Sequence, residues 1–236
     1  MNRRKYVGLF VIGVLLTAFI LTCAFAEPRA SLAQVSKIEG KVVGEKTETK
    51  LSPILIYDEK NLLEISIEDV GKYHGDICPC VIIGFRATHL AISEIWGGEI
   101  PKRSDFKIIS KSPTLGTQDA FDFITRAKTG RNRQGDFKVE LPEETNYENL
   151  SNANFVFSFI RKSTNDSIEI QIKEEVFPES YFELRKQVKF GKATQKEKET
   201  FKSAKQKLKY RLMNLPSDEL FVLRLKTSAQ RGQQGK

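Results

Sequence analysis

Beyond the N-terminus, the most continuous apolar segment of the chain lies at 79–96, PCVIIGFRATHLAISEIW. Its length and composition predict a buried helix. Pro79 suits the first turn of a helix, because the N–H that proline lacks would have no partner there. Gly97 and Gly98 follow the segment, and glycine is typical of the end of a helix. We therefore expect a helix at 79–96 to lie at the centre of the fold.

A two-residue alternation of apolar and polar positions appears in the middle of the chain. Phenylalanine occupies every second position from 155 to 159, and the segment 168–176 (IEIQIKEEV) repeats the alternation. Between them, TNDS at 164–167 is typical of a hairpin turn. Two such segments predict neighbouring strands of an antiparallel sheet with one face in water. Further short strands are expected at 54–57, 106–110, 137–141 and 221–225.

Helix signals account for much of the remaining chain. Ser66 precedes two acidic residues, which is typical of a helix start. The segment 118–128 is amphipathic, with apolar positions at helical spacing. Two further helices are expected at 179–190 and 194–214, the second beginning with a capping box. Together these patterns predict an α+β fold, in which an antiparallel sheet is packed by a central helix and the C-terminal third is helical.

The N-terminus has a pattern of its own. Three basic residues at 3–5 precede an unbroken apolar run at 6–26, which ends in Ala-Phe-Ala. This is the pattern of an export signal that is cleaved after Ala26, and it predicts a periplasmic or other extracytoplasmic protein. The run is also long enough to span a bilayer, so a membrane anchor at 6–26 is the alternative.

The rest of the chain has the length of one domain. The polar segment 27–60 is expected to be a linker or edge segment, 61–227 to form the α+β domain, and 228–236 to be a disordered tail. Beyond the leader only Cys78 and Cys80 remain, separated by one proline. They are too close together to staple distant segments, which excludes a disulfide framework.

His74 and Cys78 are the first candidate functional pair. Cys78 precedes the start of the central helix, where free N–H groups and the helix dipole favour the thiolate form. Gly75 lets the chain turn sharply beside His74. Imidazole and thiolate are ligands of zinc and of nickel, cobalt or iron. From spacing alone, an alternative stays open: a turn at His74-Gly75 and a buried thiol at a helix cap.

The same residues carry a family resemblance. HGDICP at 74–79 resembles the H-G-x-x-C-P motif of the FmdE family, which is named after formylmethanofuran dehydrogenase. The match extends through LPSDELF near the C-terminus, and with it come Gly84, Arg86, Ala91, Gly116, Asp119 and Ala120. The resemblance implies an α+β core domain with a divalent transition metal, zinc first, bound around His74 and Cys78.

Two positions depart from the family pattern. Cys80 stands where a glycine is common, and it could be a third ligand, a resolving thiol or a core residue. Because the first turn of a helix is expected to point Cys78 and Cys80 in different directions, a core position is favoured. Gly116 stands where many family members have a second cysteine, which argues against a redox cycle between two such thiols.

Asp119 and Arg86 are the remaining candidate site residues. Asp119 is expected either to complete the metal site or to orient His74 by a hydrogen bond, and a simple helix cap is the structural alternative. Arg86 lies within the apolar helix and needs a partner, because a buried unpaired charge is very costly. An ion pair with Asp119 or Asp76 is favoured over the binding of an anionic cofactor or ligand.

Charge and motifs narrow the function further. The formal net charge is +8, and basic residues gather from residue 185 onward. In an exported protein these lysines are expected on solvated helix faces, so nucleic acid is not an expected partner, although proximity to a membrane is compatible with them. A homodimer is also compatible with the sequence. No phosphate-binding loop, dinucleotide-binding glycine motif, haem-attachment CxxCH or G-x-S-x-G motif is present.

Two functions follow from these observations. The first is an exported metal-binding protein with an open site of His74, Cys78 and Asp119, which binds a transition metal or a small anionic ligand. The alternative is a metal-dependent or thiol-dependent oxidoreductase, related to formylmethanofuran dehydrogenase, in which Cys78 is the catalytic group.

Overall fold

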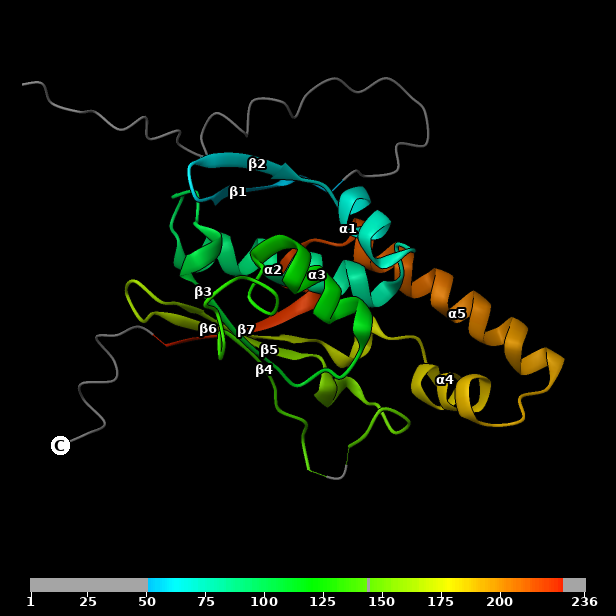
Figure 1. Cartoon of the computed structure of the whole chain (residues 1–236). Helices are drawn as coiled ribbons and strands as arrows, with labels where there is room; N and C mark the ends of the chain where they lie inside the picture. The colour runs from blue at the N-terminus through cyan, green and yellow to red at the C-terminus, as the bar shows by residue number, and fades with distance from the viewer. Residues whose placement is uncertain (1–50, 144, 227–236) are drawn as a thin grey trace, which may run out of the picture.

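Three layers build the part of the chain that a computed structural model describes, residues 51–143 and 145–226 (Figure 1). A two-stranded hairpin lies on one side, helices α2 and α3 lie in the middle, and a five-stranded sheet lies on the other side. The expected leader, tail and most of the linker fall outside the described residues. The strands are β1 (Ile54–Asp58), β2 (Asn61–Ile65), β3 (Phe106–Ser110), β4 (Phe137–Val139), β5 (Val156–Arg161), β6 (Ser167–Ile172) and β7 (Phe221–Lys226). The helices are α1 (Ile67–His74), α2 (Pro79–Ile95), α3 (Leu115–Thr125), α4 (Tyr181–Phe190), α5 (Gln195–Asn214) and α6 (Ser217–Leu220).

The larger sheet has the strand order β4-β3-β5-β6-β7. All neighbours are antiparallel except β3 and β4, which are parallel. The predicted α+β class and the hairpin of β5 and β6 are confirmed, whereas the expected purely antiparallel meander is wrong at β4. Strand β2 was not predicted from the sequence, and its pairing with β1 makes a hairpin across the boundary expected at residue 60.

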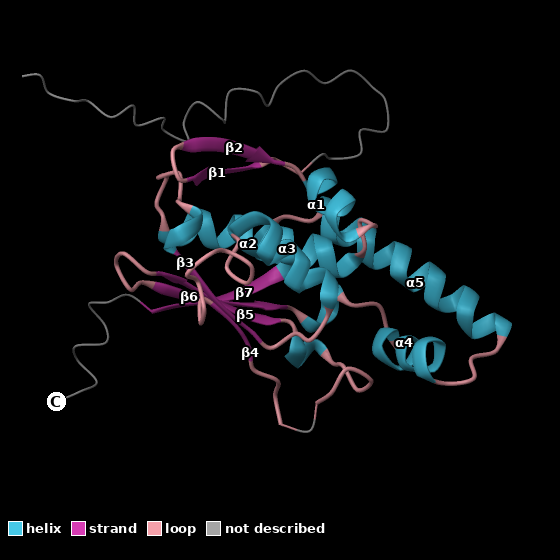
Figure 2. Cartoon of the chain, in the orientation of Figure 1, coloured by secondary structure: helices cyan, strands magenta, loops and turns pink. Residues whose placement is uncertain are grey.

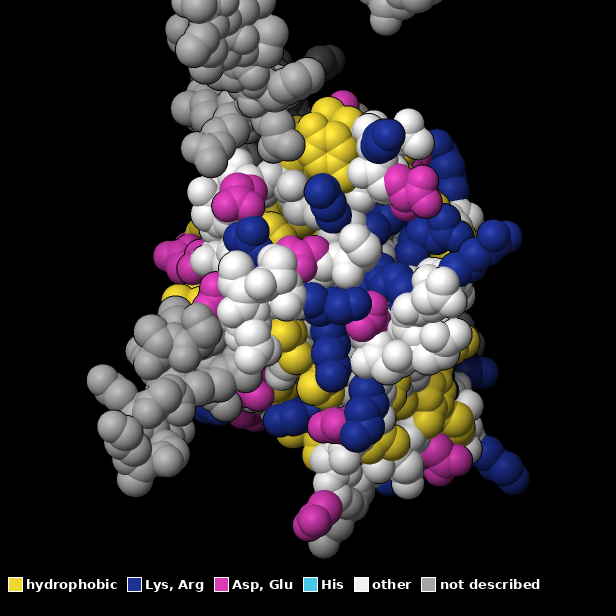
Figure 3. Space-filling view, turned by 60° about the vertical axis from the view of Figure 1, so that its left-hand side comes forward, with side chains coloured by type: hydrophobic (Ala, Val, Ile, Leu, Met, Phe, Trp, Pro, Cys, Tyr) yellow, Lys and Arg dark blue, Asp and Glu magenta, His cyan; other side chains and the backbone are white. Residues whose placement is uncertain are grey.

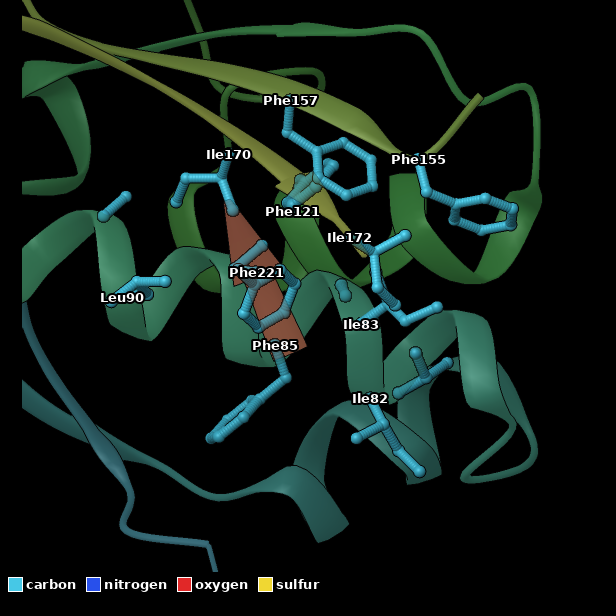
Figure 4. Packing of buried hydrophobic residues seen from close by; sticks show 14 of the residues in the cluster. Ile82, Ile83, Phe85, Leu90, Phe121, Phe155, Phe157, Ile170, Ile172 and Phe221 are labelled. Carbon is cyan, nitrogen blue, oxygen red and sulfur yellow. The ribbon is translucent and has the colours of Figure 1, made fainter. Parts of the chain in front are cut away.

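The central helix α2 begins and ends close to the predicted positions. Cys78 is its N-cap residue and Pro79 its first helical residue, while Trp96 is the C-cap. The helix contacts β5 and β6, as predicted from the alternating phenylalanines. Figure 4 shows Ile83 of α2 and Phe121 of α3 facing Phe157 of β5, with all three side chains within the core.

Helices α2 and α3 approach closely at Gly84. A Cβ atom at this position would lie 2.8 Å from the Cβ of Ala120, closer than packed carbon atoms tolerate. The absence of a side chain at Gly84 therefore allows the two helices to touch. This contact matters for the site, because each helix contributes residues to it.

Helix α3 begins earlier than predicted. Its first residue is Leu115 instead of residue 118, and its N-cap residue is Thr114. Asp119 consequently lies beyond the first turn, so the alternative role as a helix cap is wrong. Gly116 and Thr117 obscured this start, because both residue types have low helix propensity.

The predicted helical C-terminal third consists of α4, α5 and the short α6. Figure 2 shows α4 and α5 side by side, extending past the end of the five-stranded sheet. The predicted capping box of α5 is present between Thr194 and Glu197. None of the helices within residues 51–226 is both long and apolar enough to cross a membrane. On the face in Figure 3, acidic and basic side chains lie interspersed.

Candidate functional site

His74 lies at the end of helix α1, not on the loop where the sequence analysis expects it. It is the last residue of α1, and Gly75 follows as the C-cap residue with φ +94°. This left-handed conformation is readily available only to glycine. A Ser66–Asp69 capping box fixes the start of the same helix. The two ends of α1 thus define the direction in which the imidazole projects.

The imidazole of His74 is held by helix α3. Its Nδ1 atom lies 2.7 Å from Oδ2 of Asp119, and both side chains are partly buried. Burial disfavours the protonated ring. However, the hydrogen bond to Asp119 and the negative charges of Cys78 and Asp119 outweigh burial and raise the pKa of His74. Asp119 thus orients the ring, the second of the two roles predicted for it, and leaves Nε2 of His74 as the nitrogen available to a ligand.

Cys78 is a thiolate at neutral pH in this environment. The Cys80 thiol, which donates toward the Cys78 sulfur, has the largest influence and lowers the pKa of Cys78 to about 5, against the opposing effect of burial. The backbone N–H groups of Val81 and Cys80 and the charge of His74 act in the same direction. The helix N-terminus therefore stabilises the thiolate as predicted.

Cys80 does not point away from Cys78, and this expectation is wrong. Its hydrogen bond to Cys78, followed by burial and the Cys78 charge, raises the pKa of Cys80 well above the usual value for a thiol. Thr114 also hydrogen-bonds the Cys80 sulfur. Cys80 is thus a neutral donor next to the thiolate, and not a simple apolar core residue.

Gly116 of α3 covers the two thiols from the opposite side. A Cβ atom at Gly116 would lie 2.9 Å from the Cβ of Cys80 and 3.1 Å from the Sγ of Cys78. Any larger residue would press on the sulfur or displace α3. The glycine therefore permits close approach between α3 and the first turn of α2.

Arg86 does not form the ion pairs expected for it. Its Nη1 donates to the carbonyl oxygens of Leu212 at 2.8 Å and Leu215 at 2.6 Å, and its Nη2 donates to Ser217 Oγ at 3.1 Å. The guanidinium therefore caps the C-terminus of α5, a location that favours positive charge. These bonds give Arg86 a structural role, and its predicted cofactor-binding role gains no support from them.

The two acids considered as partners of Arg86 have other contacts. Asp119 is bound to His74 at 2.7 Å, and Asp76 lies 3.7 Å from the Nζ of Lys205. An ion pair between Arg86 and either acid is therefore wrong for this fold.

Two residues of α4 near the thiols escaped the sequence analysis. Tyr181 is buried, and burial together with the charges of Cys80 and Cys78 raises its pKa. Arg185 is only 7% exposed, and its charge lowers the pKa of Cys80. The four-residue spacing places both side chains on one face of α4. They were missed because α4 is distant in sequence, although a buried arginine is a signal in itself.

Arg185 has no acidic partner within 4.0 Å among the described residues. Its Nη1 donates to the carbonyl oxygen of Tyr147 at 3.1 Å. The guanidinium lies 5.2 Å from the ring centroid of Tyr147 and 5.8 Å from that of Phe190. Ring faces stabilise a cation but do not neutralise it. The site therefore contains a positive charge close to a thiolate.

The donor set fits an open metal site and not a closed one. Within residues 51–143 and 145–226, no group of three His, Cys, Asp or Glu side chains is arranged to hold a metal ion. A structural zinc site needs four protein ligands. His74 Nε2 and Cys78 Sγ offer two donors of suitable chemistry, with the imidazole already oriented by Asp119. Water or another ligand would have to supply the remaining positions.

The different environments of the two thiols predict different reactivity in the metal-free protein. Cys78 should be alkylated by iodoacetamide with a midpoint near pH 5 instead of near pH 9, because the thiolate is the nucleophile. Cys80 should stay unmodified across this range. Mass spectrometry of the peptide that contains both residues measures this. Equal modification of both thiols, or a midpoint near pH 9, would contradict the arrangement described.

The fold and site define a class of protein: an α+β domain with a thiol, an imidazole and a carboxylate gathered where a central helix begins. The chain belongs to the FmdE family, since the family's sequence model, "FmdE, Molybdenum formylmethanofuran dehydrogenase operon", matches residues 73–222. The resemblance inferred from the sequence motifs is thereby confirmed.

One solved structure similar to this chain is a tungsten formylmethanofuran dehydrogenase FmdE-like protein from Syntrophus aciditrophicus. The two share 18% sequence identity with a TM-score of 0.41. The similarity covers 72% of this chain and 74% of the other. No protein of curated function matches the chain at a significant level.

Proposed function

We propose that this FmdE-family protein binds a divalent transition metal, zinc first, at an open site outside the cytoplasm. His74 and Cys78 are the proposed ligands, and Asp119 orients the imidazole instead of completing the coordination. The protein would handle the metal itself or a small anionic ligand that fills the open positions. This proposal is more specific than the family assignment.

The observation that carries the proposal is the continuous contact from Asp119 through His74 to Cys78. A carboxylate that holds one ring nitrogen leaves the other nitrogen as the donor, which is a common arrangement around zinc-bound histidines. The low pKa of Cys78 supplies a thiolate without a pH change. Both properties are useful to a metal site, and a simple turn and helix cap would need neither.

The anionic ligand is supported by Arg185. This residue is buried, lies near the thiols, and lacks a carboxylate partner among the described residues. A negatively charged ligand at the open positions would have this charge in reach, whereas the charge of Arg86 is already satisfied by the C-terminus of α5. Arg185 therefore replaces Arg86 as the proposed anion-recognising residue.

Cobalt(II) spectroscopy tests the metal site directly. Adding cobalt to metal-free protein should produce a thiolate-to-cobalt charge-transfer band that Cys78→Ser lacks. Asp119→Asn should retain the band but weaken cobalt affinity about 10–100-fold, since it alters only the residue that orients the ligand. Lys205→Gln, which removes an exposed charge near Asp76, is the matched control. A band of unchanged strength in Cys78→Ser would show that the metal is bound elsewhere.

A second candidate function is an oxidoreductase that uses Cys78 as its reactive thiolate. The observation that favours it is the neutral Cys80 thiol next to Cys78. Oxidised glutathione tests it: the Cys78 thiolate would attack the disulfide and release one glutathione, and Cys80 would then displace the second. A lasting glutathione adduct in both the native protein and Cys80→Ser would exclude such a resolving role.

The proposed location depends on the leader expected at 1–26. N-terminal sequencing of the protein from the exported fraction should begin at Glu27 if the signal is cleaved after Ala26. Recovery of the intact apolar run from the membrane fraction would instead indicate an anchor at 6–26.

A further inference from the structure

Strand β7 forms an open edge of the five-stranded sheet. It is paired with β6 on one side, and no described strand pairs with its other side. Three of its apolar side chains are substantially exposed: Val222 by 43%, Leu223 by 36% and Leu225 by 48%. The opposite edge is the three-residue strand β4. Long apolar edges are rare in monomeric proteins, because they pair readily with other strands.

The backbone of β7 presents hydrogen-bonding groups to this free edge. Lys173 N donates to Leu220 O at 2.9 Å, so residue 220 forms a hydrogen-bonded antiparallel pair with residue 173. Such pairs alternate along a ladder. Val222 and Arg224 therefore direct their backbone groups toward β6, whereas Leu223 and Leu225 direct theirs outward. The parity agrees with the bond from Ile172 N to Phe155 O, which assigns the intervening residues of β6 to β5.

The surface beside β7 is hollowed on the side of α2. A hollow of about 370 Å³ is lined by Leu90, Glu94, Ser217, Asp218, Phe221 and Leu223. Helix α2 thus leaves the outer apolar side chains of β7 uncovered. The only charged residue of the strand whose side chain is described is Arg224, and Glu169 of β6 pairs with it at 3.2 Å. Its charge is therefore partly satisfied within the same sheet and protects the edge less than a free charge would.

We propose that β7 pairs antiparallel with β7 of a second copy of this chain, with the two-fold axis at Leu223. The two sheets would become one continuous sheet, with the helices of both copies on the same face. This proposal is independent of the proposed metal site.

The sequence of β7 selects this register. Residues directly opposite each other in an antiparallel pair point to the same face of the sheet, so the axis must pass through a residue. An axis at Arg224 would place two arginines opposite each other, which is unfavourable. An axis at Val222 would leave Leu225 without an opposite residue in the second β7.

An axis at Leu223 avoids both problems. It places Leu223 opposite Leu223 of the second copy, Phe221 opposite Leu225, and Val222 opposite Arg224. The apolar residues on the α2 side then face one another, and the arginines are kept apart. Because the backbone groups of Leu223 point outward, the central pair is hydrogen-bonded, with a Cα–Cα distance of about 5.5 Å.

Cysteine cross-linking of the full chain tests both the partner and the register. In Leu223→Cys, the two new thiols should form a disulfide-linked dimer under mild oxidation, because the expected Cα distance lies within the disulfide range. Val222→Cys is the matched control: it is one residue away and similarly exposed, yet it faces Arg224 of the second copy and should not cross-link to itself. The native chain, with its own cysteines, gives the background.

Light scattering supplies a readout that does not depend on a new thiol. The native full chain should have the mass of a dimer, and Leu223→Lys should have the mass of a monomer with unchanged circular dichroism. A monomeric native chain would overturn the proposal, and so would dimers that persist in Leu223→Lys. Equal cross-linking of Leu223→Cys and Val222→Cys would overturn the register. If Leu223→Lys unfolds, the comparison of the two cysteine variants still decides.

Discussion

Replacing Cys78 by serine should remove most of the metal that this protein binds, whereas replacing Cys80 by serine should remove little. A serine hydroxyl is not ionised at neutral pH and cannot substitute for the thiolate as a ligand. The Cys80 thiol is neutral and acts as a hydrogen-bond donor to Cys78, so its loss should raise the Cys78 pKa without removing a ligand. Elemental analysis of the purified full chain and the two variants gives metal per protein.

The comparison also separates a site from a fold element. Both serine variants keep the side-chain size at the N-terminus of α2, so similar thermal unfolding is expected for both. Full metal content in both variants would mean that the start of α2 has only a structural role. Loss in both would show that Cys80 is a ligand, contrary to the role proposed for it.

Truncating Phe121 to alanine should lower the free energy of unfolding by about 3–5 kcal/mol. Its side chain is fully buried between α2 and the sheet. The ring lies edge-on to Phe157 at a centroid distance of 5.1 Å and edge-on to Phe159 at 5.5 Å. The variant loses these contacts and leaves a cavity that the surrounding rings cannot fill.

Phe123→Ala, on the same helix, is the matched control for this prediction. Phe123 is partly buried and contacts the exposed Tyr73 at a centroid distance of 5.2 Å, so a clearly smaller loss is expected. Urea unfolding monitored by circular dichroism measures both. If the two variants lose equal stability, the layer between α2, α3 and the sheet is not the main core.

Local sequence signals predicted those elements whose ends are marked by capping residues. Ser66 and Pro79 locate the starts of α1 and α2 to the residue, because caps and N1 prolines act within a single turn. Strand β2 was missed because NLLEI does not alternate, and two of its residues, Leu62 and Leu63, are adjacent leucines. Its pairing with β1 is a tertiary fact that no local pattern contains.

The candidate site divides along the same line. His74 and Cys78 are four residues apart, so sequence and family motif both lead to them. The contact of Asp119 with His74 follows from the packing of α3 against α1, which the motif suggested but spacing did not. Arg185 could not be predicted as a neighbour of the thiols, since nothing in the sequence relates α4 to the start of α2. The direction of Cys80 was predicted wrongly from an isolated helical turn.

The contact of Arg86 with the end of α5 has a consequence for the modularity of the chain. A guanidinium in the central helix is satisfied by carbonyl oxygens more than a hundred residues later. Removing α5 would leave that charge in the core without acceptors, a severe cost to the remaining domain. The core and the C-terminal third are thus a single unit of inheritance. A shortened form or a fusion to another protein should keep the chain intact through residue 226, and a boundary between β6 and α4 would divide one folding unit.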